Sequence, residues 1–70
     1  MFRDYYLNLS MQPEGEYEIH ISGCDWFPSR QYEYLGRYQF ASTALDVARR
    51  RHPGWAINGC IHCCPEINTD

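Results

Sequence analysis

The fold of this chain depends most on one short segment near its C-terminal end, NGCIHC at residues 58–63. Its two cysteines, Cys60 and Cys63, have the C-x2-C spacing that lets one tight turn direct two sulfur atoms at the same metal ion. The glycine directly before Cys60 suits a turn that also offers its backbone N–H groups to the sulfur. The segment therefore predicts one half of a metal site.

A second pair of ligand residues, His20 and Cys24, lies earlier in the chain with three residues between them. His20 ends a predicted strand, and Cys24 lies beyond a predicted bend at Ser22 and Gly23, so the strand end and the loop are expected to converge. The two pairs together supply one nitrogen and three sulfur ligands, which matches a closed tetrahedral zinc site. Such a site would close the span between Cys24 and Cys60 and stabilise the fold.

The length of the chain favours such a stabilising cross-link, which small domains often carry. Seventy residues form one small domain, 1–70, which buries only about 60% of its unfolded surface and has a marginal core. The hydrophobic fraction of 44% and the charged fraction of 21% exclude a disordered or collagen-like chain. The sequence has no apolar run of about 18 residues, so we expect no membrane span.

The cysteines allow two other interpretations. Four cysteines are enough for two disulfide bonds, and they could also be free, buried, small hydrophobic residues. Residues 1–6 do not read as a signal peptide, which favours a reducing cytoplasmic location and therefore the metal site. Cys64 directly follows Cys63 and is an alternate candidate for the fourth ligand. We expect His52 and His62 to be structural or solvent-facing rather than ligands.

The hydrophobic pattern predicts an α+β fold. We expect strands at residues 2–9, 17–21 and within 32–40, with a turn at residues 11–15 and a loop at residues 24–29 closed by Pro28. Gly36 is expected to mark a bulge or bend in the third strand. The expected result is a small three-stranded antiparallel sheet with one helix, followed by a C-terminal cysteine knuckle.

The single helix is predicted over residues 44–52, capped by Ser42 or Thr43 and stopped by the Pro-Gly pair at residues 53–54. Its apolar residues fall within one arc of the helix, and the polar residues Asp46, Arg49 and Arg50 fall on the opposite side. The expected apolar face consists of Ala44, Leu45, Val47 and Ala48.

The chain carries, in order, the motifs YYLN at 5–8, QPEG at 12–15, EIH at 18–20, GCDWFP at 23–28, YLG at 34–36 and NGCIHC at 58–63. This ordered set resembles a family of small uncharacterised bacterial proteins over nearly the whole chain, and it implies no particular activity. Members of that family often end in a further Cys-His pair. The corresponding residues here are EINT at 66–69, so a ligand role for this tail is lost.

A more distant resemblance is to the metal-binding domain of Ada-type DNA alkylation-repair proteins. In that domain a C-x3-C pair is followed by a helix and a C-x2-C pair. His20 stands here in place of the first cysteine, while Cys24, Cys60 and Cys63 fit the pattern. The resemblance implies a zinc site. It does not imply methyl transfer from a DNA phosphotriester, because the first cysteine is missing and the surface is not basic.

Charge and aromatic content bear on the partner. Six tyrosines and two tryptophans exceed what a small core buries with every O–H and N–H satisfied, which favours a protein-binding surface. Arg49 and Arg50, with Arg37 nearby, could contact nucleic-acid phosphates while tyrosines stack on bases. The formal net charge of −3 disfavours that interpretation, because nucleic-acid binders are usually basic.

The sequence therefore predicts a cytoplasmic, non-enzymatic, zinc-stabilised module that binds another protein. A four-ligand zinc has no open position for catalysis, and the sequence contains no catalytic triad order, phosphate-binding loop or H-E-x-x-H motif. Two alternatives stay open at this point, a nucleic-acid-binding zinc module and a disulfide-stapled extracytoplasmic interaction protein. The sequence leaves the oligomeric state undetermined.

Overall fold

A computed structural model of the chain describes residues 1–25 and 31–69. Within these residues the sheet has four strands in the order β3-β1-β2-β4. The elements along the chain are β1 (Arg3–Asn8), β2 (Tyr17–Ile21), β3 (Tyr32–Tyr38), the helix α1 (Ala41–Arg51), β4 (Ile57–Gly59) and a short 3-10 helix η1 (Pro65–Ile67). The α+β class is confirmed, but the three-stranded antiparallel sheet was wrong in strand number and direction.

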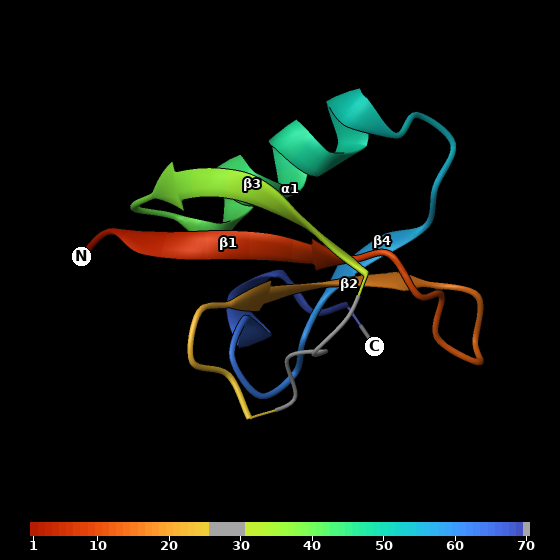
Figure 1. Cartoon of the computed structure of the whole chain (residues 1–70), viewed down its shortest axis with the longest axis horizontal. Helices are drawn as coiled ribbons and strands as arrows, with labels where there is room; N and C mark the ends of the chain where they lie inside the picture. The colour runs from red at the N-terminus through yellow and green to blue at the C-terminus, as the bar shows by residue number, and fades with distance from the viewer. Residues whose placement is uncertain (26–30, 70) are drawn as a thin grey trace.

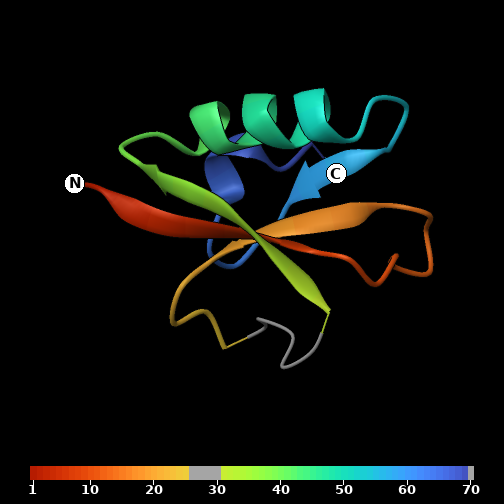
Figure 2. The same cartoon turned by 45° about the horizontal axis from the view of Figure 1, so that its top comes forward.

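The strands β1 and β2 form the predicted hairpin. They pair antiparallel, with Tyr5 opposite Ile21 and Leu7 opposite Ile19. Alternation along both strands directs these apolar residues toward α1, which lies across one face of the sheet (Figures 1 and 2). The hairpin therefore places His20, whose neighbour Ile19 is in the core, on the other side of the sheet.

The strand β3 pairs antiparallel with the free edge of β1, and the predicted irregularity at Gly36 is confirmed. Gly36 lies opposite Tyr5, and Tyr34 lies opposite Tyr6, so Leu35 between them is the extra residue of a bulge. Gly36 has a φ of +125°, a backbone conformation that glycine adopts without strain. The bulge changes the alternation, and Leu35 is buried while Tyr34 is 48% exposed.

The strand missed by the sequence analysis is β4. It pairs parallel with β2, with Tyr17 opposite Ile57 and Ile19 opposite Gly59. Its three residues are too short to give a periodic pattern, and its partner strand lies far away in the sequence. The segment expected to form only the cysteine knuckle is therefore preceded by a strand that fixes where the knuckle starts.

The helix begins at Ala41 rather than Ala44, and its N-cap residue is Phe40, which makes no side-chain cap hydrogen bond. The prediction of Ser42 or Thr43 as the cap was therefore wrong. Ala41 is 2% exposed and packs in the core, so burial of this first turn outweighs the capping preference of the next two residues. The helix ends at Arg51, one residue earlier than predicted, and His52 is its C-cap before the predicted Pro-Gly stop.

One hydrophobic core lies between α1, η1 and the inner face of the sheet. Ala44 and Ala48 are fully buried, as predicted, whereas Leu45 and Val47 are partly buried against its edge. The buried core consists of Tyr5, Leu7, Ile19, Leu35, Ala41, Ala44, Ala48, Cys64 and Ile67.

No helix among residues 1–25 and 31–69 has both the length and the apolar character needed to cross a membrane.

The loop expected at residues 24–29 falls largely outside the described residues, and so does the closing Pro28. The part that is described, Cys24 and Asp25, leads away from the end of β2 on the side opposite α1 (Figure 2).

Candidate metal centre

A tight turn at the end of β2 brings Cys24 back toward His20. The backbone N–H of Cys24 donates to the carbonyl of Ile21 at 3.2 Å. Gly23 has a φ of +86° in this turn, which is why a glycine suits the position. The predicted bend is confirmed, and it joins a ligand on the strand to a ligand just beyond it.

A second turn follows β4 and forms the knuckle. The backbone N–H of Cys60 donates to Ile19 at 3.0 Å and so continues the pairing with β2, while the N–H of Cys64 returns to the Cys60 carbonyl at 2.8 Å. A Cβ atom on Gly59 would lie 2.7 Å from the carbonyl oxygen of Cys64. Only glycine allows the knuckle to fold back so closely on the end of β4.

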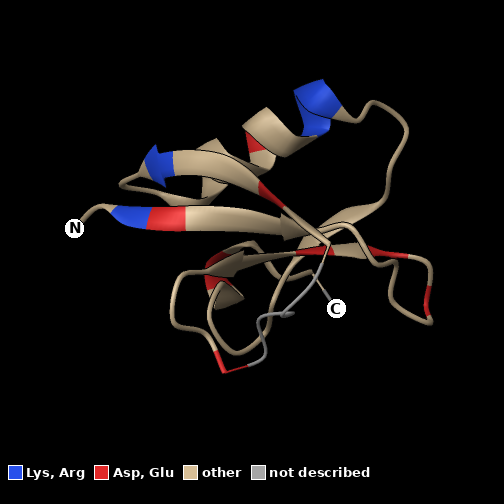
Figure 3. Cartoon of the chain, viewed as in Figure 1, with Lys and Arg blue, Asp and Glu red and all other residues tan. Residues whose placement is uncertain are grey.

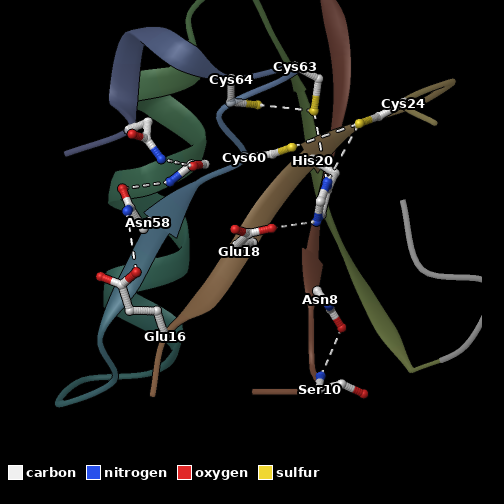
Figure 4. A network of polar contacts seen from close by, with 12 residues as sticks. Asn8, Ser10, Glu16, Glu18, His20, Cys24, Asn58, Cys60, Cys63 and Cys64 are labelled. Carbon is white, nitrogen blue, oxygen red and sulfur yellow. Dashed lines mark hydrogen bonds and ion pairs between the residues drawn. The ribbon is translucent and has the colours of Figure 1, made fainter. Parts of the chain in front are cut away.

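The two turns bring together the four residues predicted as ligands, His20, Cys24, Cys60 and Cys63. The Nδ1 atom of His20 lies 3.7 Å from Cys24 Sγ and 3.9 Å from Cys63 Sγ, and the sulfur atoms of Cys24 and Cys60 are 4.0 Å apart (Figure 4). All four ligand atoms lie within 4.8 Å of one another, so the group could hold a metal ion.

The spacing of these atoms fits a small tetrahedral ion. Zn–S bonds of about 2.3 Å and Zn–N bonds of about 2.0 Å give a tetrahedron with edges of about 3.8 Å between sulfurs and about 3.5 Å from sulfur to nitrogen. The corresponding distances here, 4.0 Å and 3.7–3.9 Å, are only a few tenths of an ångström longer. All four cysteines are free thiols, and a sulfur separation of 4.0 Å is about twice a disulfide bond length.

The surroundings of His20 prepare it as a ligand. Its side chain is 1% exposed, and this burial lowers its pKa, which keeps the imidazole neutral at pH 7. Its Nδ1 atom faces the sulfurs, while its Nε2 atom lies 3.4 Å from a carboxylate oxygen of Glu18. The contact is an ion-pair distance rather than a hydrogen bond, and a carboxylate beside the far ring nitrogen is the arrangement that typically orients a metal-binding histidine. Glu18 is a residue whose role the sequence analysis missed, although it shares a strand face with His20.

The thiols of the knuckle have raised pKa values, so they are protonated unless a cation lies beside them. Burial raises the pKa of Cys60 to about 11, against the opposing effect of the backbone N–H groups of Cys63 and His62. The hydrogen bond with Cys64 and burial raise the pKa of Cys63 as well. The backbone N–H of Ile21 donates to Cys63 Sγ at 3.4 Å and favours its thiolate. These thiols therefore stay protonated at neutral pH until a metal ion displaces their protons.

Buried amide groups hold the segment after the knuckle against β4. Asn58 is 3% exposed, and its Oδ1 accepts hydrogen bonds from the backbone N–H groups of Gly59 at 2.9 Å and Thr69 at 3.0 Å. Asn68 Nδ2 donates to the Gly59 carbonyl at 2.8 Å. The network around Asn58 fixes both ends of the knuckle and so positions Cys60. The sequence gives one signal for it, the Asn-Gly pair before Cys60.

The remaining candidate ligands lie outside this group of four. Cys64 is fully buried in the hydrophobic core, with its sulfur 4.0 Å from that of Cys63. His62 is exposed in the knuckle turn. His52 stacks on Trp55 with ring centroids 3.9 Å apart, and its Nε2 lies 2.7 Å from a carboxylate oxygen of Glu33.

The three arginines considered for nucleic-acid contact do not share one surface. Arg37, at the end of β3, lies 3.0 Å from the carboxylate of Asp4. Arg49 and Arg50 are exposed in the last turn of α1, whose basic end is separate from the basic end of β3 (Figure 3).

Comparisons of the chain with family models, with curated proteins and with solved structures find no match. The two family resemblances therefore stay predictions, and the site rests on its own geometry.

Proposed function

We propose that this protein is a non-enzymatic module whose fold is stabilised by one zinc ion, and that it acts by binding another protein. His20, Cys24, Cys60 and Cys63 would hold the ion. The observation that carries this proposal is the convergence of these four ligand atoms, from two distant segments, to within 4.8 Å of one another, with three of the distances within a few tenths of an ångström of a zinc tetrahedron edge. A reducing compartment such as the cytoplasm would keep the thiols available.

Zinc is favoured over other metals by the chemistry of the ligands. Three thiolates and one imidazole select zinc among the common divalent ions, because magnesium and calcium prefer oxygen ligands. Four protein ligands complete the coordination of zinc and leave no position for a substrate, which supports a structural rather than catalytic role.

The partner surface proposed here is formed by Tyr6, Tyr32 and Tyr34, named the tyrosine surface below. It lies on the sheet face away from α1. The ring centroid of Tyr6 is 5.5 Å from that of Tyr32 and 5.2 Å from that of Tyr34, and both outer tyrosines are 48% exposed. A depression of about 250 Å³ lined by Tyr6, Ser22, Gly23 and Tyr32 continues this surface. Clustered, partly exposed tyrosines are typical of protein-binding hot spots.

Charge supports a protein rather than a nucleic acid at this surface. The hydroxyl of Tyr34 donates to Asp4 at 2.8 Å, so a carboxylate lies directly beside the aromatic rings. Arg37 already pairs with the same carboxylate, and Arg51, which donates to the backbone carbonyl of Tyr34, pairs with Glu33. A phosphate backbone that crossed the tyrosine surface would meet this acid without a compensating group of cations.

The metal part of the proposal is tested by native mass spectrometry of the full chain. The expected result is one zinc ion per chain, lost on denaturation, with four free thiols remaining. Replacement of Cys60 by alanine should abolish zinc retention, whereas Cys64→Ala, a matched change at the neighbouring buried cysteine, should keep it. A metal-free native chain or a chain with disulfide bonds contradicts the proposal, and zinc loss in Cys64→Ala would assign the fourth ligand to that residue instead.

The partner is tested by capture from cell lysate with zinc-loaded protein. We expect Tyr32→Ala and Tyr34→Ala to reduce capture of a given protein at least about tenfold, as for hot-spot residues. Phe40→Ala removes an aromatic side chain of similar exposure (62%) outside the tyrosine surface and should leave capture unchanged. Capture that disappears on nuclease treatment would instead indicate a nucleic acid, and capture that no tyrosine variant changes would reject this surface.

A further inference from the structure

The sulfur atoms of the metal centre are not equally shielded. Cys60 is 2% exposed, whereas Cys24 and Cys63 are only partly buried. Both partly buried cysteines line a surface pocket of about 550 Å³, and Cys60 does not. A small solute therefore reaches the centre from the side of Cys24 and Cys63.

The pocket itself is accessible to a small polar solute. Its rim carries the charged or polar side chains of Arg3, Asp25, His62 and Glu66. Its volume falls in the range of about 300–1,000 Å³ that is usual for small-molecule sites, so a molecule of a few atoms enters with its hydration.

Cys24 and Cys63 each lie close to other sulfur atoms, since all four ligand atoms are within 4.8 Å of one another. Two of the sulfur pairs have a separation of 4.0 Å, and they differ in how readily they form a disulfide bond. Cys24 and Cys60 lie 36 residues apart with their sulfurs at 4.0 Å, a separation that a small movement of either side chain can close. Cys63 and Cys64 have the same sulfur separation but are adjacent in the sequence. A disulfide bond between adjacent residues closes an eight-membered ring that distorts the peptide bond, so it is the less favourable pair.

We propose that Cys24 is an oxidation site at which a peroxide, entering through this pocket, releases the metal by forming a disulfide bond between Cys24 and Cys60. This inference rests on the proposed zinc site and adds a form of regulation to it. Reduction of the disulfide by a thiol reductant would restore the ligand set.

The chemistry proceeds in two steps. The Cys24 thiolate attacks one oxygen of hydrogen peroxide, an S–O bond forms as the O–O bond breaks, and the departing hydroxide takes a proton to become water. The Cys60 thiolate then attacks the sulfur of the resulting Cys24 sulfenic acid. An S–S bond forms, the S–O bond breaks, and the second hydroxide leaves as water after protonation. Two thiolates are oxidised by two electrons in total, and one peroxide is reduced to two waters.

The consequence is loss of half of the ligand set. A disulfide sulfur is not a thiolate and binds zinc poorly, so His20 and Cys63 alone remain as ligands. The same bond covalently joins the loop after β2 to the knuckle, so the two segments stay together after the ion leaves.

The experiment starts from the zinc-loaded full chain, with zinc content measured before oxidant is added. Treatment with one equivalent of hydrogen peroxide, followed by a chromogenic zinc indicator, should show zinc release in step with the loss of two thiols per chain. Trypsin cleaves only after arginine here, and it separates residues 4–30, which contain Cys24, from residues 52–70, which contain the other three cysteines. A bond between Cys24 and Cys60 therefore joins two fragments, and mass-spectrometric fragmentation identifies the cysteine in the second.

Trapping with dimedone, which reacts with sulfenic acids, should label the 4–30 fragment first. The Cys64→Ala variant should release zinc at an unchanged rate, because its sulfur takes no part in the reaction. Retention of zinc and thiols under peroxide overturns the inference while the proposed zinc site stands. A disulfide bond that joins Cys24 to Cys63, or one confined to residues 52–70, also overturns it. A chain that holds no zinc before the oxidant is added rejects the proposed function, and this inference with it.

Discussion

The two halves of the sheet are built from different kinds of contact. The strands β1 and β3 pair over six register positions, and the core residues Tyr5, Leu7 and Leu35 pack beneath them. The strand β4 pairs with β2 over only three positions and then leads into the knuckle. Hydrophobic burial dominates the first half, whereas the second half adds the cysteine cluster and the amide contacts of Asn58 to its own core residues, Ile19 and Ile67. Ligand atoms and buried amides therefore supplement the core at this edge of the sheet.

Removal of the metal is the change with the largest expected effect on stability, because it would leave only the hydrophobic core to hold the two halves. Binding of structural zinc contributes about 10–16 kcal/mol of apparent free energy in finger peptides, as much as the whole stability of a typical small domain. A strong chelator should therefore unfold the chain or shift its urea midpoint to near zero. Circular dichroism with and without chelator measures this directly. Equal midpoints in the two conditions would show that the apolar half holds the fold alone.

The next largest effect is expected from truncation of a core side chain in the apolar half of the sheet, which is formed by β1 and β3. Leu7 is fully buried, and Leu7→Ala should reduce the free energy of unfolding by about 2–5 kcal/mol. Phe2→Ala changes a 55% exposed side chain at the end of the same strand and should have little effect. Urea unfolding of the zinc-loaded variants provides the comparison. If Leu7→Ala costs no more than Phe2→Ala, the division into two kinds of contact is wrong.

A smaller effect is expected from the residue behind the histidine ligand. Glu18→Gln removes the charge near His20 Nε2 while keeping a similar shape, and loss of such a contact typically lowers metal affinity about 10–100-fold. Competition with a zinc indicator measures the affinity. Glu14→Gln, at an exposed position in the preceding turn, is the matched control. An affinity of Glu18→Gln equal to that of the control would remove Glu18 from the metal centre.

The smallest effect is expected at the contact between α1 and β3. Arg51 and His52 both lie 2.7 Å from carboxylate oxygens of Glu33. Burial acts to raise the pKa of Glu33, but the hydrogen bonds from these two residues outweigh it and hold the pKa below the ordinary 4.5. The contribution of Glu33 to stability is therefore fully present above pH 4.5 and is lost as the pH falls through the lowered value.

This contribution should be less than about 1 kcal/mol, because the arginine and the carboxylate are partly exposed. The measurement is the difference in unfolding free energy between the native chain and Glu33→Gln as the pH is lowered. Metal release in acid affects both chains equally and cancels in this difference. A difference that grows on acidification would contradict the expected sign.

Much of the fold was predictable because its signals are local. The alternation of residues 17–21 and the helical spacing of Ala44 and Ala48 each specify one element. The strand β4 was not predictable, because a three-residue strand is defined only by its pairing with β2. The start of α1 was missed for a similar reason, since the burial of Ala41 is a tertiary effect.

The candidate metal ligands were predictable because ligand chemistry restricts residue type and spacing so strongly. The supporting residues were harder to identify. Glu18 shares a strand face with His20, which gave a signal, but glutamates on exposed strand faces are common. Cys63 faces the other three candidate ligands, whereas Cys64 faces the hydrophobic core. Two adjacent cysteines in a sequence do not show which of them faces which side.

The separation of the two ligand pairs along the chain has a consequence for how the protein forms. Ligands that lie 36 and 43 residues apart cannot be brought together by any local folding event. A metal ion bound by His20 and Cys24 alone, or by Cys60 and Cys63 alone, would be held weakly. Capture of the proposed zinc ion would therefore be a late step, which follows the closure of a long loop. The supply of free zinc at that moment, rather than the rate of strand pairing, would set the yield of folded protein.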